Sequence, residues 1–436
     1  MNLNRCFKIF SAVFYNLIFS VLFIIGLIPL WAWCLLKKHS ILPRLGGFRV
    51  PFFSCSPVWF HAASMGEINV IDATVRQIRA EYPQCPIVIT TTSETGQAKI
   101  KQTYPEGVFS CLLPVDFFPC IALMVFRLRP ACIVIVETEL WPNLCYSLDM
   151  AQVPRILINA RISDKSHTFY RLTAWFWKSC LRDFHLVLAR SRVDAQRFLE
   201  LGVEPSVLHV LPHIKNGSLL KRISHTNRPL AEIEQWCPAI PLVVFGSIRE
   251  KEESDIINTI EKLLSDYQKI KIILAPRHMS RLPNIRIRLE QIKLPYQLKT
   301  GIPSGMVPDS SVRIIILDTM GELIPAYQSA VLGFVGGTLA DYGGHNILEP
   351  VLMQVPVLFG PYIANCPQEA EIILQNQAGI QVQDQTELLK TIRRLVSEPE
   401  PLRRMKSNTM VVNQHLQQVN AQVWSYLQPF IPPPIQ

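Results

Sequence analysis

Short apolar runs rich in β-branched residues alternate along this chain with spacers long enough for helices. A first set follows the stretch "VWFH" and a second set fills the later half of the chain: Pro86–Thr92, Cys132–Thr138, Arg155–Arg161 and His185–Arg190, then Pro241–Gly246, Lys271–Ala275, Arg313–Leu317, Ala330–Gly337 and Val355–Gly360. Strands this apolar, separated by helix-length spacers, predict parallel sheets that are covered by helices on both faces. We therefore expect an α/β protein with two such domains.

One segment near the start has a different character. Ile9–Leu36 contains no charged residue, and it exceeds the ~20 residues that cross a bilayer as a helix. It is longer than the ~7–15 apolar residues of a secretory signal, and no A-x-A-like cleavage site follows it. More basic residues follow the run than precede it, which favours a cytoplasmic location for the rest of the chain: Lys37, Lys38, Arg44 and Arg49 against Arg5 and Lys8.

A polar, basic stretch poor in apolar periodicity, Leu211–Pro229, separates the two sets of strands. The expected organisation is an anchor over residues 1–40 with its helix at about 9–36, a first domain over 41–212, a linker over 213–230, a second domain over 231–428 and a loose Pro-rich tail over 429–436. Ligands of such sheets bind beyond the carboxyl ends of the strands, so we expect a cleft between the two domains.

The net charge is +9, which is compatible with nucleic acid, anionic lipid or a phosphorylated substrate. The 11 cysteines form no C-x-x-C pair and no His/Cys spacing typical of zinc sites. This usage predicts reduced, mostly buried thiols in a reducing compartment.

The stretch "HAASMGE" places Glu67 in the first turn of a helix, where a dinucleotide-binding loop would have glycines. Ser64 and Glu67 fit the capping-box pattern, in which the two side chains satisfy backbone N–H groups at a helix start. The alternative is a carboxylate held at the edge of a binding cleft for chemistry. The residues alone leave both readings open.

Several strand ends in the second domain carry polar groups. "VVFGSIREKEE" predicts a helix start near Ser247 with the Ser-x-x-Glu pattern, "APRH" presents Arg277 and His278, and "DTMGEL" presents Met320, Gly321 and Glu322. A Gly-rich loop then runs into a helix start at Asn346–Glu349. Each feature alone is also explained by capping, a turn or a surface charge. Together they predict nucleotide binding, and the absence of G-x-G-x-x-G and G-x-x-x-x-G-K-[ST] disfavours a nicotinamide dehydrogenase and a P-loop enzyme.

Two further stretches in the first domain allow two interpretations each. In "VETELWPN", Glu137 and Glu139 would lie on the same side of an extended segment, either as functional carboxylates or as a solvated strand end; with no Asp-x-Asp in the chain, a metal–diphosphate clamp has no obvious ligands. Arg161–Asp183 mixes bulky aromatic and basic residues. It is either a surface for a membrane or an anionic lipid, or an ordinary helix with a solvated basic face.

Seven motifs in this order resemble the Kdo (3-deoxy-D-manno-octulosonic acid) transferases of lipopolysaccharide biosynthesis: "HAASMGE", "ETELWPN", "INARIS", "SRVDAQRFLELG", "APRH", "DTMGEL" and "GGTL…GGHNILEP". The resemblance covers nearly the whole chain. It implies the GT-B architecture, two Rossmann-like domains with an interdomain cleft, and a metal-independent inverting glycosyltransferase. The donor would be CMP-Kdo and the acceptor a lipid A precursor (lipid IVA) on the cytoplasmic face of the inner membrane, with no cofactor and no nucleic acid partner. The number of Kdo residues added stays open.

The resemblance also implies roles for individual residues. Glu67 would be the general base and Glu139 would stabilise the transition state, while Lys215 corresponds to a family lysine whose surroundings, "LPHIKNG", depart from the family pattern. CMP would be held by Pro276, Arg277, Met320, Gly321, Glu322, Asn346, Ile347, Leu348 and Glu349. Two alternatives from other classes are a nucleotide-sugar epimerase of related fold and a non-catalytic membrane-bound binding protein.

Overall fold

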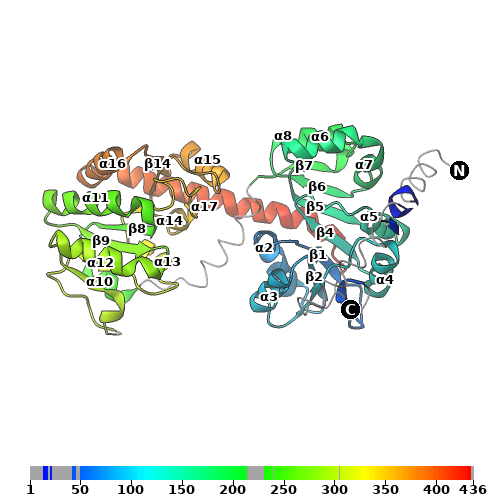
Figure 1. The fold of residues 1–436 in the computed structure, drawn as a ribbon, viewed down its shortest axis with the longest axis horizontal. Helices are drawn as coiled ribbons and strands as arrows, with labels where there is room; N and C mark the ends of the chain where they lie inside the picture. Colours follow the sequence, from blue (N-terminus) through cyan, green and yellow to red (C-terminus); the bar gives the residue numbers. More distant parts are fainter. Residues whose placement is uncertain are drawn as a thin grey trace. The chain divides into compact units, whose positions relative to one another are not determined.

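The computed structural model describes residues 13–17, 20–21, 42–45, 50–212, 214, 230–238, 240–303 and 305–433. The chain divides into two compact units: the first comprises Met1–Ser218 together with Gln418–Gln436, and the second Leu219–Gln417. Within the described residues, each unit contains one seven-stranded sheet flanked by helices (Figure 1). All strand pairs in both sheets are parallel, as the apolar runs predict.

The first sheet has the strand order β3-β2-β1-β4-β5-β6-β7. Its strands are β1 Val58–His61, β2 Ile87–Thr91, β3 Val108–Leu112, β4 Cys132–Val136, β5 Arg155–Ala160, β6 Leu186–Ala189 and β7 Leu208–Val210. Its helices are α2 Met65–Glu81, α3 Glu94–Thr103, α4 Phe118–Leu128, α5 Pro142–Met150, α6 Asp164–Leu172, α7 Ala174–Leu181 and α8 Arg192–Glu200, with short 3-10 turns at η1 Leu42–Leu45 and η2 Pro205–Val207.

Side chains alternate between the two buried faces of this sheet. Val58 and Phe60 of β1 pack with α2 in one hydrophobic cluster, whereas Trp59 packs with α4 and α5 in another. Because β1 pairs with β2 on one side and β4 on the other, the chain reverses its direction across the sheet between β1 and β4. In open α/β sheets, ligands bind beyond the carboxyl ends of the strands at such a switch point.

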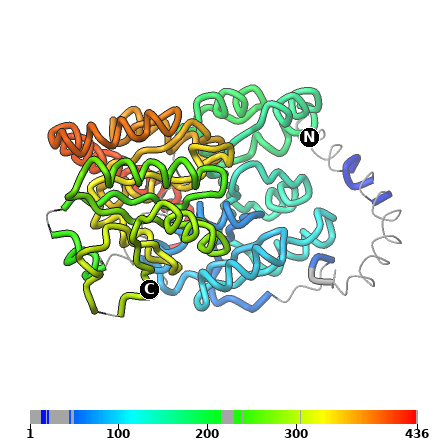
Figure 2. Tube along the Cα trace, turned by 60° about the vertical axis from the view of Figure 1, so that its left-hand side comes forward, coloured from blue at the N-terminus to red at the C-terminus, as the bar shows by residue number. Residues whose placement is uncertain are grey.

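The second sheet repeats this plan, with the order β10-β11-β9-β8-β12-β13-β14 and its switch point between β8 and β12. Figure 2 follows its trace from green to orange. The strands are β8 Leu242–Ile248, β9 Lys271–Pro276, β10 Tyr296–Leu298, β11 Ile314–Ile316, β12 Leu332–Val335, β13 Val357–Phe359 and β14 Gly379–Gln381. The helices are α10 Ala231–Trp236, α11 Glu253–Asp266, α12 Leu282–Gln291, α13 Leu323–Gln328, α14 Leu348–Leu352, α15 Pro367–Gln375, α16 Gln385–Ser397 and α17 Pro399–Leu427, with 3-10 turns η4 Glu250–Glu252, η5 Met279–Arg281, η6 Lys299–Gly301 and η7 Gln428–Phe430.

The second domain was expected to end at residue 428, but the second unit ends at Gln417, within the last helix, α17. Val412 and Leu416 pack in the core of the second unit, but Val419, Val423 and Leu427 pack with α2 in the core of the first. The helix therefore returns the chain to the first unit at Gln418. The expected loose tail also differs over its described part, because the 3-10 turn η7 continues the helix and Ile431 is buried in the same core. Apolar residues at every third or fourth position of α17 allow its successive turns to pack in the two cores.

Most of the expected anchor, residues 9–36, lies outside the described residues. Among the residues that the structure describes, no helix is both long and apolar enough to cross a membrane. Residues 13–17 are helical, and they contact the first unit. The ring of Phe14 lies 6.0 Å from that of Trp175 on α7, and the Tyr15 hydroxyl donates to Asp116 Oδ2 at 3.0 Å.

Candidate functional site

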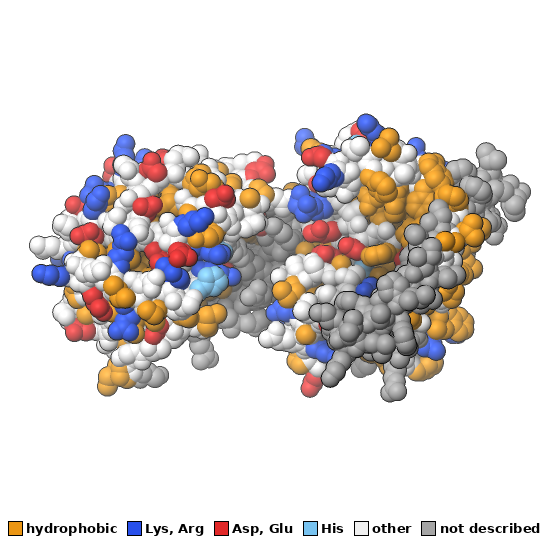
Figure 3. Space-filling model, viewed as in Figure 1, with side chains coloured by type: hydrophobic (Ala, Val, Ile, Leu, Met, Phe, Trp, Pro, Cys, Tyr) orange, Lys and Arg blue, Asp and Glu red, His pale blue; other side chains and the backbone are white. Residues whose placement is uncertain are grey.

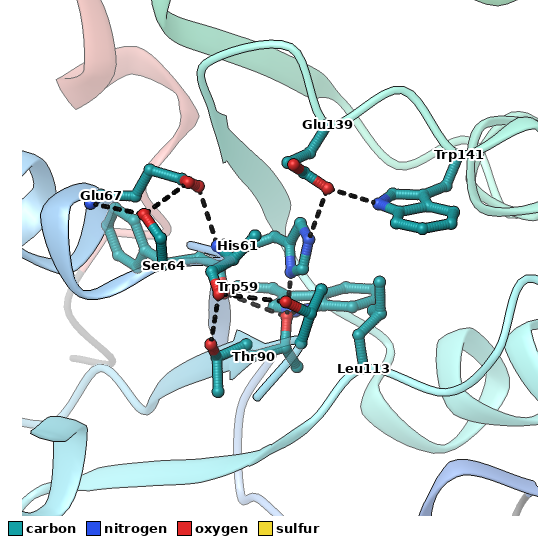
Figure 4. A network of polar contacts seen from close by, with 12 residues as sticks. Trp59, His61, Ser64, Glu67, Thr90, Leu113, Glu139 and Trp141 are labelled. Atoms are coloured by element: carbon teal, nitrogen blue, oxygen red, sulfur yellow. Dashed lines mark hydrogen bonds and ion pairs between the residues drawn. The ribbon is translucent and has the colours of Figure 1, made fainter. Parts of the chain in front are cut away.

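The turn between β1 and α2 forms the predicted capping box (Figure 4). Ser64 is the N-cap of α2, and its Oγ accepts from the Glu67 N–H at 3.3 Å and donates to Glu67 Oε1 at 2.7 Å. The other carboxylate oxygen, Oε2, accepts from the Ala63 N–H at 2.8 Å. The capping interpretation is thus confirmed, and it fixes the Glu67 side chain rigidly at the switch point of the first sheet.

The capping contacts leave the Glu67 carboxylate able to accept further hydrogen bonds. A carboxylate has about four acceptor positions, and the contacts with Ala63 and Ser64 use one on each oxygen. Glu67 is 7% exposed, and this burial raises the pKa of its carboxyl above the ordinary value, with the nearby Glu137 and Glu139 adding to the shift. A raised pKa and spare acceptor positions are what a general base requires.

The segment after β4 does not extend as expected. Glu137 has a left-handed backbone with φ +59°, so the chain leaves the strand at Val136 and the interpretation of Glu137 and Glu139 as neighbours on one extended face is wrong. The turn carries Glu139 over β1, where its Oε2 accepts from Trp141 Nε1 at 3.0 Å. Burial raises the pKa of Glu139, and the charge of Glu137 raises it further.

His61, the last residue of β1, lies beneath Glu139 (Figure 4). It is fully buried, its Nδ1 lies 2.9 Å from Thr90 Oγ1 on β2, and its Nε2 lies 4.0 Å from Glu139 Oε2. Burial lowers the pKa of His61 to about 4. This histidine was not among the predicted site residues, although its position at the end of a strand beside the switch point is a signal that singles it out.

In the second unit, a buried carboxylate again follows the first strand of the sheet. The expected Ser247–Glu250 box is wrong: Ser247 still belongs to β8, the N-cap is Arg249 and the capping carboxylate is Glu252. Glu252 Oε1 accepts from the N–H groups of Arg249 at 2.9 Å and of Gly337 at 2.5 Å. Its Oε2 accepts from the Leu339 N–H at 3.3 Å.

Glu252 thereby holds the Gly-rich loop that follows β12. A Cβ on Gly336 would lie 2.4 Å from Glu252 Oε1, and one on Gly337, which has φ +70°, would lie 2.7 Å from the His345 ring. Neither position has room for a side chain. The loop is fixed by this close approach, which explains the pair of glycines in "GGTL".

Basic side chains gather around His345 at this end of the second sheet. Burial lowers the pKa of His345 to about 4, and the charges of Arg277, Arg249 and His278 lower it further. Arg277 and His278 are exposed after β9, and Arg249 lies over the Tyr342 ring at 4.2 Å. On the face of the second unit shown in Figure 3, a histidine lies among Lys and Arg side chains. Such a cluster is suited to an anionic ligand.

The other predicted nucleotide-binding residues lie at neighbouring strand ends. Met320 is exposed after β11, Gly321 has φ +88°, and Glu322 Oε1 lies 3.8 Å from Lys299 Nζ. Pro276 ends β9 with its side chain buried.

The helix predicted to start within Asn346–Glu349 is α14, which begins at Leu348 with Ile347 as its N-cap. Asn346 Oδ1 accepts from the Leu348 N–H at 3.3 Å. Ile347 and Leu348 are fully buried in the core, so only their backbone can face a ligand, whereas Asn346 and Glu349 are partly exposed. Lys215 lies outside the described residues. Within the part of the chain that the structure describes, no group of three or more His, Cys, Asp or Glu side chains is arranged to hold a metal ion.

Residues 39–217 match the family model of 3-deoxy-D-manno-octulosonic-acid transferase (kdotransferase). The chain is 29% identical over 362 residues to the 3-deoxy-D-manno-octulosonic acid transferase of Haemophilus influenzae, covering 81% of this chain and 82% of that protein. It is 28% identical over 412 residues to the transferase of the same name from Chlamydia pneumoniae, covering 92% of each. These similarities confirm the resemblance drawn from the motifs.

Among solved structures, the UDP-GlcNAc 2-epimerase from Neisseria meningitidis bound to UDP-GlcNAc aligns with a TM-score of 0.55 at 12% identity, covering 83% of this chain and 100% of that one. At this identity the likeness concerns the fold alone. It agrees with two parallel-sheet α/β units.

The contacts of Glu252 lead to a test of the Gly-rich loop. Glu252→Gln replaces one acceptor oxygen by an NH₂ group, which leaves a buried N–H donor unpaired, and such a loss costs about 1–3 kcal/mol. We expect a lower free energy of unfolding and faster amide hydrogen exchange in residues 336–340, measured by mass spectrometry. The matched control is Glu250→Gln, because the Glu250 side chain is 65% exposed and pairs with Arg281 at the surface. Equal exchange rates in the two variants would show that Glu252 does not hold the loop.

Proposed function

We propose that this chain, a Kdo transferase by its similarity along most of its length to enzymes of that name, moves Kdo from CMP-Kdo to a lipid A precursor with inversion at the anomeric carbon. The observation that carries the proposal is the division of charge between the switch points of the two sheets. The first holds the carboxylates of Glu67, which is buried, and of Glu139, which is partly buried. The second holds basic groups around His345.

The basic cluster of the second unit suits the donor. CMP-Kdo carries a phosphate and a sugar carboxylate, and Arg277 with Arg249 can neutralise both without a metal ion. Glu349 would accept hydrogen bonds from the ribose hydroxyls, with Asn346 beside it. Met320, Gly321 and Glu322 would contact the nucleotide from the end of β11, while Pro276, Ile347 and Leu348 shape the backbone around it.

The carboxylates of the first unit suit the acceptor. A sugar hydroxyl of the lipid attacks the anomeric carbon of Kdo, the bond from that carbon to the phosphate oxygen breaks, and CMP leaves with the bonding electron pair. The hydroxyl proton passes to Glu67, which has acceptor positions beyond its capping contacts. Glu139 would stabilise the positive charge that develops on the Kdo ring. Lys215 stays a candidate for the leaving phosphate.

The first unit also carries a surface that suits a lipid substrate. Figure 3 shows apolar side chains gathered over its α5, α6 and α7 side, and the large apolar residues exposed there and on α4 are Phe126, Met150, Phe169, Leu172 and Trp175. The exposed basic residues of the stretch Arg161–Asp183 are Arg161, Lys165, Arg171, Lys178 and Arg182.

The start of the apolar N-terminal run contacts this same surface. Besides the ring contact between Phe14 and Trp175, the ring of Tyr15 lies 5.7 Å from that of Phe176. We propose that the apolar run of residues 9–36 anchors the chain to the inner membrane. The α6–α7 surface would then face the lipid headgroups from the cytoplasmic side.

The direct test is incubation of the purified full chain with CMP-Kdo and lipid IVA, with and without excess EDTA, followed by mass spectrometry of the lipid. We expect one or more additions of Kdo, CMP release that depends on the lipid, and equal rates with EDTA. Release of a modified free sugar without lipid would favour an epimerase instead. Nucleotide binding with no product of either kind would favour a binding protein.

The raised pKa of Glu67 predicts a pH dependence that Glu67→Gln removes. The base acts only when ionised, so kcat/KM should rise with pH through a pKa above that of an ordinary Glu. Glu67→Gln should lower kcat by roughly 10²–10⁴-fold and abolish this acid limb, as followed by radiolabelled Kdo transfer.

The matched control for Glu67→Gln is Asp194→Asn. Asp194 is a second buried carboxylate in the first turn of a helix, it accepts from its N-cap Ser191, and its Oδ1 accepts from the Ile162 N–H at 2.9 Å. If both variants lost activity in proportion to their lower stability, Glu67 would be a capping residue only.

The α6–α7 surface predicts a selective effect on the lipid. Reversing charge at Arg171 and Lys178 to Glu should raise the KM for lipid acceptor embedded in anionic vesicles by roughly 30-fold or more, because each basic residue near such a surface contributes ~1 kcal/mol. The KM for CMP-Kdo should not change. The control reverses Lys101 and Lys390, which are exposed elsewhere in the two units and change the net charge equally. An unchanged lipid KM in the first variant would make this stretch an ordinary solvated helix pair.

A further inference from the structure

His61 has a polar atom that the proposed mechanism does not use. The histidine is fully buried, and its Nε2 has no hydrogen-bond partner within the described structure. A buried polar group left unpaired costs free energy, so an isolated one calls for an explanation. The closest acceptor is Glu139 Oε2 at 4.0 Å, about 1 Å beyond a normal hydrogen bond.

The partners of Thr90 indicate which nitrogen of His61 carries the proton. Trp59 Nε1 donates to Thr90 Oγ1 at 2.9 Å. The single hydroxyl proton of Thr90 then has two acceptors, His61 Nδ1 at 2.9 Å and the Phe60 carbonyl at 3.4 Å. Donation to Nδ1 is the shorter contact, and the neighbouring carboxylate favours it, because a proton on Nδ1 would instead turn the Nε2 lone pair toward Glu139. In a neutral ring only one nitrogen carries hydrogen, so Nε2–H becomes the donor and points toward Glu139.

We propose that His61 is a positioning residue for Glu139: as substrate closes the site, its Nε2–H completes a hydrogen bond to the Glu139 carboxylate and holds that carboxylate ionised in one orientation. The inference rests on the proposed Kdo transfer and deepens it. Catalytic hydrogen bonds are often long before substrate binds. Trp141 Nε1 approaches the same oxygen, so two donors would converge on Glu139 Oε2.

This arrangement separates the roles of the carboxylates of Glu67 and Glu139. The groups around Glu139 are Glu67 of α2, Glu137 of the same turn, and Tyr170 of α6, besides His61 and Trp141. Donors on Glu139 favour its ionised form, and its negative charge in turn raises the pKa of Glu67. One carboxylate is thus kept ionised as a stabiliser, while the other becomes the stronger base.

The test compares two amide variants of the same residue. In His61→Asn the amide oxygen reaches the place of Nδ1 and accepts from the Thr90 hydroxyl, whereas in His61→Gln the amide NH₂ reaches the place of Nε2 and keeps the donor toward Glu139. Steady-state Kdo transfer gives kcat, both KM values and the pH profile. Circular dichroism and thermal unfolding report whether each variant is folded.

We expect His61→Asn to lower kcat roughly 10- to 100-fold, the range set by a hydrogen bond to a charged group. It should also add a second acid limb to kcat/KM beside that of Glu67, because Glu139 without its donor ionises only at higher pH. His61→Gln should recover most of the loss. Adding His61→Asn to Glu139→Gln should cost little more than Glu139→Gln alone, since the donor then has no carboxylate to hold.

Equal losses in the two His61 variants, or additive losses in the double variant, would overturn the proposal and leave His61 as a packing residue. A wild-type protein that binds CMP but transfers no Kdo would instead overturn the proposed function. The two failures are therefore distinguishable.

Discussion

Burial of both faces of two parallel sheets is the constraint on which the rest of this structure depends. Interior strands such as β1, β4 and β8 are buried at every residue, so their side chains are committed to packing. Polar chemistry is then confined to the strand ends and the loops that follow them, and the reversal of strand order opens space at one point in each sheet. His61, Glu139, Arg249 and the Gly-rich loop all lie at these two points.

Each unit has a capping glutamate after its first strand, but the two glutamates have different roles. Glu67 and Glu252 each sit in the first turn after the first strand of their sheet. Glu67 accepts from one backbone N–H and the Ser64 hydroxyl, and Glu252 accepts from three backbone N–H groups. Glu252 is fully buried, and it joins two loops that are 85 residues apart in the chain. The contacts of Glu67 all come from within four residues. Glu252 is therefore committed to structure, whereas Glu67 keeps capacity for a substrate.

The sequence predicted the interior of each sheet and missed its edges. The four strands absent from the apolar runs, β3, β7, β10 and β14, are the outermost strands of the two sheets. They are only partly buried, so they lack a continuous apolar signature. The capping box of Glu67 was predictable because its partners are local. The roles of His61 and Glu252 were not, because their partners, Thr90 and Gly337, come from distant segments.

Backbone strain is also found at the strand ends beside the two switch points. Glu137 after β4 and Ser247 within β8 both have left-handed backbones, with φ +59° and +58°, a conformation that costs a residue other than glycine roughly 1–3 kcal/mol. At Ser247 the pairing of β8 with β9 shifts register, and the bulge directs Arg249 toward Tyr342 and the end of the sheet. At Glu137 the turn brings Glu139 back over His61. In each sheet, strain beside the switch point is what places a charged side chain where a regular strand could not.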